Sequence, residues 1–129
     1  MKLIQSRDNP FFKSLKRLAE SGRERRKTGR TLLDGLHLVE AYEKACGPLE
    51  TLIVGESALA GGEIVTYVAD RETVVLADAL LRDLGLVDTP SGLLAVAAMP
   101  AATVAVDPGK DAILLDGVQD PGNVGTLLR

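Results

Sequence analysis

The apolar residues of the first part of the chain recur at helical spacing and predict an opening helix. Residues 8–10 supply a capping side chain and then a proline, which is suited to the first helical position. Phe11, Leu15 and Leu18 follow at intervals that place them on one face. Gly22 is the expected end of this helix.

After Gly22 the pattern alternates between strand-like and helix-like segments. Strands are predicted at residues 31–34, 49–54, 73–77 and 93–98, helices at 36–45 and 79–84, and a helical turn at 57–59. Asp78 is expected to cap the helix that follows it. Residues 64–68 fit either a strand, by their β-branched content, or one helical face. The alternating order favours the helix.

This order predicts an α/β fold, a small three-layer domain with a mainly parallel sheet between helices. We expect the domain to span residues 1–105. Residues 106–129 are expected to form a linker and the start of a second unit, because residues 112–115 are apolar and predict one more strand. One strand and half a helix cannot bury both faces of that strand, so we expect the chain to be a truncated part of a longer protein.

The segment 116–129 carries the candidate chemistry. It is a polar, glycine-rich turn between a strand and a helix, the position where α/β proteins place functional groups. Its candidate site residues are Asp120, Pro121, Gly122, Asn123, Gly125 and Arg129. Glycines allow close backbone approach, and an arginine is always charged. The alternative is that Asn123 and Arg129 only cap and decorate a helix.

Charge is unevenly distributed along the chain. Residues 1–30 hold ten Lys or Arg and three Asp or Glu, whereas the whole chain has a net charge of −3. The candidate nucleic-acid-binding residues form one block, Arg23, Arg25, Arg26, Lys27 and Arg30. Lys13, Lys16 and Arg17 lie on the polar face of the first helix. Such a block suggests a polyanionic partner, and the alternative is a solvated helix end.

Other candidate sites have less support. Cys46 is the single cysteine, which excludes an internal disulfide, and we expect it to be a small core residue. His37 is the single histidine and lacks partners for a proton relay. No residues have the spacing of a metal site or a phosphate-binding P-loop. The apolar run at 93–99 is too short to span a bilayer, and no signal core is found, so we expect a cytoplasmic protein without a membrane partner.

Three segments resemble the SpoU (TrmH-type) RNA ribose methyltransferases of the SPOUT superfamily. Residues 115–129 resemble the family's first motif in the Asp-Pro-Gly-Asn-x-Gly core and the arginine that follows it. Residues 32–40 resemble its "LLEG…LVEEA" segment, and residues 88–95 its "TPQGILAV" segment. Asp34, His37 and Ser91 depart from the residues usual in these two segments.

The resemblance implies an RNA-binding domain similar to the kink-turn-binding ribosomal-protein fold, followed by the first strand and helix start of a knotted methyltransferase domain. It implies that Asn123 and Arg129 belong to a catalytic site. It also implies that the parent protein is a homodimer that methylates rRNA or tRNA with S-adenosylmethionine. The family's later motifs are absent from the chain, so these 129 residues are expected to bind no cofactor and to be inactive.

Two alternatives remain open. The first is a stand-alone RNA-binding module with a ribosomal-protein-like fold and no enzymatic activity. The second is an unrelated α/β binding protein, since a fold hosts many functions.

Overall fold

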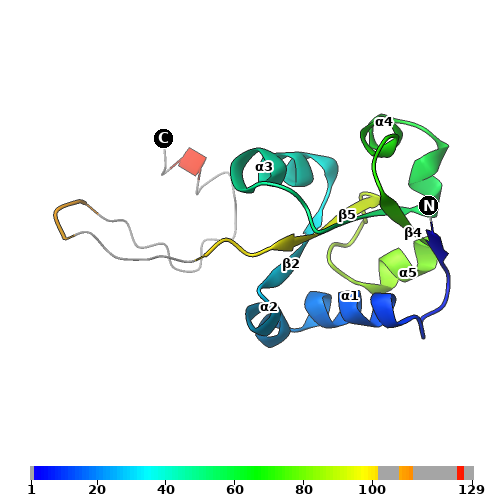
Figure 1. The fold of residues 1–129 in the computed structure, drawn as a ribbon, viewed down its shortest axis with the longest axis horizontal. Coiled ribbons are helices and arrows are strands. Elements are labelled where there is room, and N and C mark those ends of the chain that lie inside the picture. The colour runs from blue at the N-terminus through cyan, green and yellow to red at the C-terminus, as the bar shows by residue number, and fades with distance from the viewer. Residues whose placement is uncertain (1, 102–107, 112–124, 127–129) are drawn as a thin grey trace.

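Helices and strands alternate along the first hundred residues. The computed structural model describes residues 2–101, 108–111 and 125–126. In chain order the elements are β1 (Lys2–Ile4), α1 (Pro10–Glu20), α2 (Gly22–Thr28), β2 (Arg30–Asp34), α3 (Leu36–Cys46), β3 (Thr51–Gly55), the 3-10 helix η1 (Glu56–Ala60), α4 (Glu63–Val68), β4 (Thr73–Leu76), α5 (Asp78–Asp83) and β5 (Leu93–Ala98) (Figure 1).

The strands form one sheet in the order β1-β4-β3-β5-β2. β1 and β3 each pair with β4 in parallel, whereas β5 pairs antiparallel with both β3 and β2. The sheet is therefore mixed: four of its strands run in one direction and β5 runs against them, a reversal that the prediction of a mainly parallel sheet did not include. The reason is that the loop after α5 leads back to the carboxyl end of β3, where the Gly55 N–H donates to the Gly92 carbonyl at 2.8 Å. β5 starts there and must run against its neighbours.

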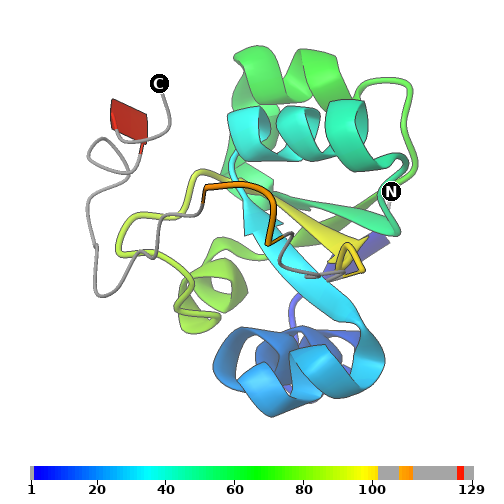
Figure 2. The same cartoon turned by 90° about the vertical axis from the view of Figure 1, so that its left-hand side faces the viewer.

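Helices cover both faces of this sheet (Figure 2). On one face α1 and α5 bury residues such as Leu15 and Leu80 against Ile53 and Leu94. On the other face α3 and α4 bury Val39 and Val68 against neighbours in β3 and β5. Adjacent residues of β5 alternate between the two cores, as a strand buried on both sides requires. The arrangement matches the expected three layers.

The opening helix begins where the sequence predicts. The Asn9 side chain accepts hydrogen bonds from the backbone N–H groups of Phe11 and Phe12, at 2.9 and 3.3 Å. The buried face consists of Phe12, Leu15 and Leu18, while Phe11 packs at its margin. Residues 64–68, which fitted either a strand or a helix, lie in helix α4, which confirms the choice.

Asp78 does not cap its helix. α5 starts after Ala77 without a side-chain cap, and the Asp78 carboxylate is turned to η1. There it accepts hydrogen bonds from the Ser57 backbone N–H, at 3.1 Å, and from the Ser57 hydroxyl. The predicted cap was wrong because an acceptor at a helix start can also be used by a neighbouring segment.

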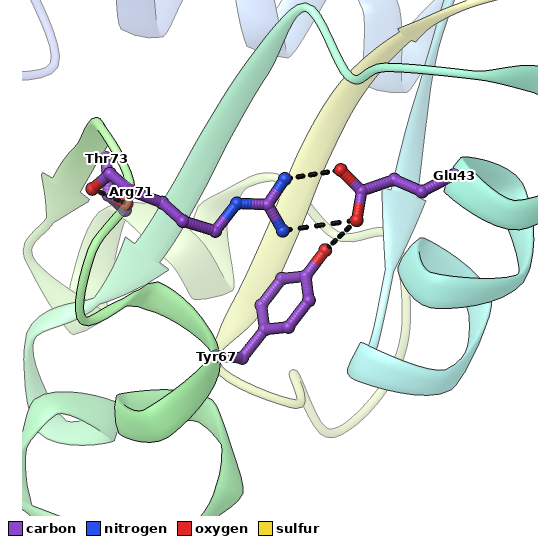
Figure 3. A network of polar contacts seen from close by, with 4 residues as sticks. All are labelled: Glu43, Tyr67, Arg71 and Thr73. Atoms are coloured by element: carbon purple, nitrogen blue, oxygen red, sulfur yellow. Dashed lines mark hydrogen bonds and ion pairs between the residues drawn. The ribbon is translucent and has the colours of Figure 1, made fainter.

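A network of three side chains joins α3 to α4 and the turn after it (Figure 3). The Arg71 guanidinium donates to both carboxylate oxygens of Glu43, and the Tyr67 hydroxyl donates to one of them. The guanidinium also lies over the Tyr67 ring, 4.5 Å from its centroid. The hydrogen bonds from Arg71 hold the pKa of the Glu43 carboxyl below its usual value.

We expect this network to make stability fall with acid. A carboxyl with a lowered folded-state pKa stabilises the fold above its unfolded pKa, and loses that contribution as the pH falls through the folded value. The free energy of unfolding should therefore drop below about pH 4.5, the ordinary value for Glu43. Because both side chains are partly exposed, the contribution should be at most about 1 kcal/mol. Urea unfolding at pH 7 and pH 3 measures it.

Glu43→Gln should lose less stability between these two pH values than the wild type. Glu40→Gln, at an exposed position of the same helix, is the matched control and should behave like the wild type. An equal acid sensitivity of all three proteins would contradict the assigned role of Glu43.

Candidate nucleic-acid interface

One edge of the sheet brings together two of the segments singled out in the sequence. The strands other than β5 end at this edge, and β5 begins there. The Gly35 N–H donates to the Leu93 carbonyl at 3.0 Å, so the segments 32–40 and 88–95 lie side by side. The Ser91 hydroxyl donates to the Leu93 carbonyl at 3.1 Å and accepts from the Leu93 N–H at 3.2 Å. We call this edge the carboxyl edge.

Close backbone approach at this edge requires glycine. Gly92 has a φ of +94°, a conformation that L side chains rarely adopt. A Cβ atom at this position would lie 2.8 Å from the Ala58 Cβ atom. Gly92 therefore allows η1 to pack directly against the loop that precedes β5.

A cavity of about 500 Å³ opens beside this contact. Its lining comes from η1, the first turns of α5 and the loop before β5. The residues are Ser57, Ala58, Asp78, Leu81, Arg82, Asp88, Thr89, Pro90, Ser91 and Gly92. This cavity was not predicted, because Asp78 was expected to cap a helix and Ser57 to lie in a helical turn, with no contact between them.

The basic block lies at the opposite edge of the sheet. α2 carries four of its residues, and Arg30 begins β2, opposite Ala98 at the end of β5. The second helix was not predicted; Ser21 caps it by accepting from the Glu24 N–H at 3.1 Å. The block and the carboxyl edge are thus two separate surfaces.

Two of the five basic residues have structural partners. The Arg25 guanidinium donates to the carbonyls of Leu18 and Ala19, at 2.6 and 3.3 Å, and so closes the end of α1. Arg30 pairs with Glu50, whose carboxylate accepts from Nε at 2.8 Å.

The remaining three basic residues of the block face solvent. Arg23, Arg26 and Lys27 are exposed, and no ion pair holds them within the described part of the chain. A phosphate could approach these three side chains without displacing an acidic partner. They are therefore the members of the block best placed to contact a polyanion.

Positive charge continues along α1. A groove of about 510 Å³ is lined by Arg7, Phe12, Lys13, Lys16, Arg17, Glu20 and Asp83. Lys16 and Arg7 are tied to acidic neighbours there, through pairs with Glu20 at 2.9 Å and Asp83 at 2.7 Å. Lys13 and Arg17 are exposed and lack an ion pair within the described residues. The exposed cations of α2 (Arg23, Arg26 and Lys27) and of α1 (Lys13 and Arg17) therefore form one surface, which we call the cationic side.

The C-terminal candidates lie mostly outside the described residues. These are Asp120, Pro121, Gly122, Asn123 and Arg129, whose roles stay predictions. Gly125 is described as helical and half-buried, beside the helical Thr126.

Cys46 is exposed at the last position of α3, so its prediction as a core residue was wrong. The buried part of that helix centres on Val39, and the final turn extends past it. His37 is exposed as well.

Among the described residues no cluster of His, Cys, Asp and Glu could hold a metal ion. None of the helices in those residues is long and apolar enough to cross a membrane.

Residues 9–95 match the family described as the MRM3-like substrate binding domain. The chain belongs to this family. It is also 32% identical, over 129 residues, to the 23S rRNA (guanosine(2553)-2'-O)-methyltransferase RlmP of Bacillus subtilis (strain 168), covering 100% of the chain and 50% of the relative. The resemblance to SpoU-type RNA 2'-O-methyltransferases is thereby confirmed.

Solved structures agree with this assignment. The crystal structure of an RNA 2'-O ribose methyltransferase is 33% identical with a TM-score of 0.73, over 98% of this chain and 50% of that one. The SpoU methyltransferase AviRb from Streptomyces viridochromogenes, in complex with AdoMet, is 22% identical with a TM-score of 0.56, over 72% and 34% of the two chains, and shows the shared fold. The chain spans about half the length of the relatives it matches.

Proposed function

We propose that this chain is the RNA-binding part of an S-adenosylmethionine-dependent rRNA 2'-O-ribose methyltransferase. The match of residues 9–95 to a substrate-binding domain family carries this proposal. The relative from Bacillus subtilis, whose name gives 23S rRNA as its substrate, supports RNA as the partner.

The cationic side offers a physical means of holding RNA. Lys and Arg side chains that neutralise phosphates release condensed counterions, which gives affinity without sequence specificity. Arg23, Arg26 and Lys27 are exposed, and Lys13 and Arg17 extend the charge along α1. Arg25 and Arg30 support the fold of this surface, since their guanidinium groups are held by carbonyls and by Glu50.

The binding of this chain to rRNA tests the proposal. The probe is a 23S rRNA fragment around guanosine 2553, the nucleotide in the name of the relative, followed by fluorescence anisotropy. If three phosphates are neutralised, the logarithm of the association constant should fall against the logarithm of salt with a slope of about −2 to −3. A chain that fails to bind this RNA saturably at low salt would overturn the proposal.

We further propose that Asn123 and Arg129 contribute to the catalytic site of the whole enzyme, a homodimer. A ribose hydroxyl loses its proton with difficulty, so a fixed positive group near the 2′ oxygen would stabilise the charge that develops there. Arginine suits this role because it stays charged and can also hold a phosphate through two parallel hydrogen bonds. S-adenosylmethionine would supply the methyl group.

The 129 residues alone should neither bind S-adenosylmethionine nor methylate RNA. The support is that the chain covers half of the length of its relatives, while the catalytic site of such enzymes is expected to need their remaining part. Titration calorimetry with millimolar cofactor, together with a methyl-transfer assay on the same RNA, measures both properties. Saturable binding at a single site would contradict this expectation.

A further inference from the structure

The cavity at the carboxyl edge has the construction of a small-ligand site. Its volume of about 500 Å³ lies within the range of about 300–1,000 Å³ found for ligand pockets. Two glycines bring its walls together: a Cβ atom at Gly55 would lie 2.9 Å from Leu81 Cδ2 and 3.3 Å from Asp78 Oδ1, and one at Gly92 would meet Ala58. Side chains in place of these glycines would displace the lining residues.

Its lining combines apolar surface with two carboxylates, Asp78 and Asp88, of which hydrogen bonds hold Asp78 in place. Leu81 and Pro90 supply apolar surface. The Asp78 carboxylate is oriented by the Ser57 backbone N–H and the Ser57 hydroxyl, one on each oxygen. These hydrogen bonds hold the pKa of the Asp78 carboxyl below its usual value, so the group is ionised at neutral pH. A carboxylate accepts about four hydrogen bonds, so both oxygens can still accept from a ligand.

A flat ring that has apolar faces and two adjacent hydrogen-bond donors on one edge matches this lining. Among the bases of RNA, guanine presents two neighbouring donors, N1–H and the 2-amino group, on its Watson–Crick edge. Adenine and cytosine present one donor beside an acceptor, and uracil has one donor between two carbonyl oxygens that would face the carboxylate. Unstacked bases of loops and bulges are the part of RNA that proteins recognise through this edge.

We propose that the cavity binds one unstacked guanine of the RNA, with its Watson–Crick edge on the Asp78 carboxylate and its ring between Leu81 and Pro90. Arg82, exposed at the rim, would lie near the backbone of that nucleotide. The inference rests on the proposed RNA-binding function and adds a base-specific contact to it. The cationic side of α1 and α2 then supplies affinity, and the cavity supplies selectivity.

Five hairpin RNAs test this site. They share one stem and differ in a single bulged nucleotide, which is guanosine, inosine, adenosine, cytidine or uridine. Because hydrogen bonds to a charged group are strong, the guanosine bulge should bind at least about tenfold more tightly than the adenosine, cytidine and uridine bulges. Inosine lacks the 2-amino group and should fall between them.

Asp78→Asn should abolish the preference, leaving all five RNAs at the affinity of the adenosine bulge. Asp70→Asn, the same change at an exposed position in the turn after α4, should retain it. The inosine comparison uses the wild-type protein and stands even if the Asp78 variant does not fold. Equal affinity of the wild type for all five bulges would overturn the inference. Salt-dependent binding without base preference would still leave the proposed RNA-binding function in place, whereas the absence of binding would remove both.

Discussion

The triple variant Arg23→Glu, Arg26→Glu, Lys27→Glu is expected to bind the 23S rRNA fragment about 100-fold more weakly than the wild type at low salt. Each substitution removes a cation that can neutralise a phosphate and adds a charge that repels one. The three side chains are exposed and are not used by the fold in any ion pair among the described residues. The variant should lose little thermal stability, only the favourable placement of Arg26 and Lys27 in the last turn of α2, while the salt dependence of any remaining binding flattens.

A second triple variant controls for net charge. Lys2, Lys44 and Lys110 are exposed and lie outside the α1–α2 side, and their replacement by Glu changes the charge of the chain by the same amount. This variant should lose much less affinity. If both triple variants lose affinity equally, the binding responds to overall charge, and no surface of the domain is specific for RNA.

The largest effect on stability is expected for Gly92→Ala, at about 2–4 kcal/mol. The substitution places a side chain at a φ of +94° and brings its Cβ atom to 2.8 Å from the Ala58 Cβ atom. Gly85→Ala is the matched control: its φ is +64°, but a Cβ atom there has nothing within 4 Å. Gly85→Ala should therefore lower the free energy of unfolding only by the cost of a side chain at positive φ, about 1 kcal/mol.

The cost of the positive φ and the cost of the clash with Ala58 can be separated by measuring the free energy of unfolding with urea. Combining Gly92→Ala with Ala58→Gly removes the clash and should recover part of the loss, since the two sites are in contact and their effects are not additive. If Gly92→Ala costs no more than Gly85→Ala, the close approach of η1 to the loop does not constrain this position.

Local signals in the sequence predicted most of the helices and strands. Helical periodicity found α1 and α3, and continuous apolar runs found β3 and β5, because these strands are buried on both faces of the sheet. Two elements were missed. β1 is three residues long and buries only Ile4. α2 begins at Gly22, taken for the end of α1, although Ser21 and Glu24 have the spacing of a capping box that would have indicated a new helix.

Contacts between segments far apart in the chain could not be predicted from local sequence patterns. The direction of β5 depends on where the loop after α5 returns to the sheet, which no periodicity records. The assignment of Asp78 as a cap failed because its partner is Ser57, in another element. In the same way, the basic block was recognised as a group, but its division into structural and exposed members depends on Leu18 and Glu50.

The central claim is that this domain binds rRNA through the cationic side formed by α1 and α2. Titration of the isotope-labelled chain with the 23S rRNA fragment, followed by amide chemical shifts, tests it most directly. The largest shifts should fall on residues 23–27 and on the exposed face of α1, and they should diminish as salt is raised. Shifts confined to α3 and α4 on the other face of the sheet, or no shifts at low salt, would contradict the claim.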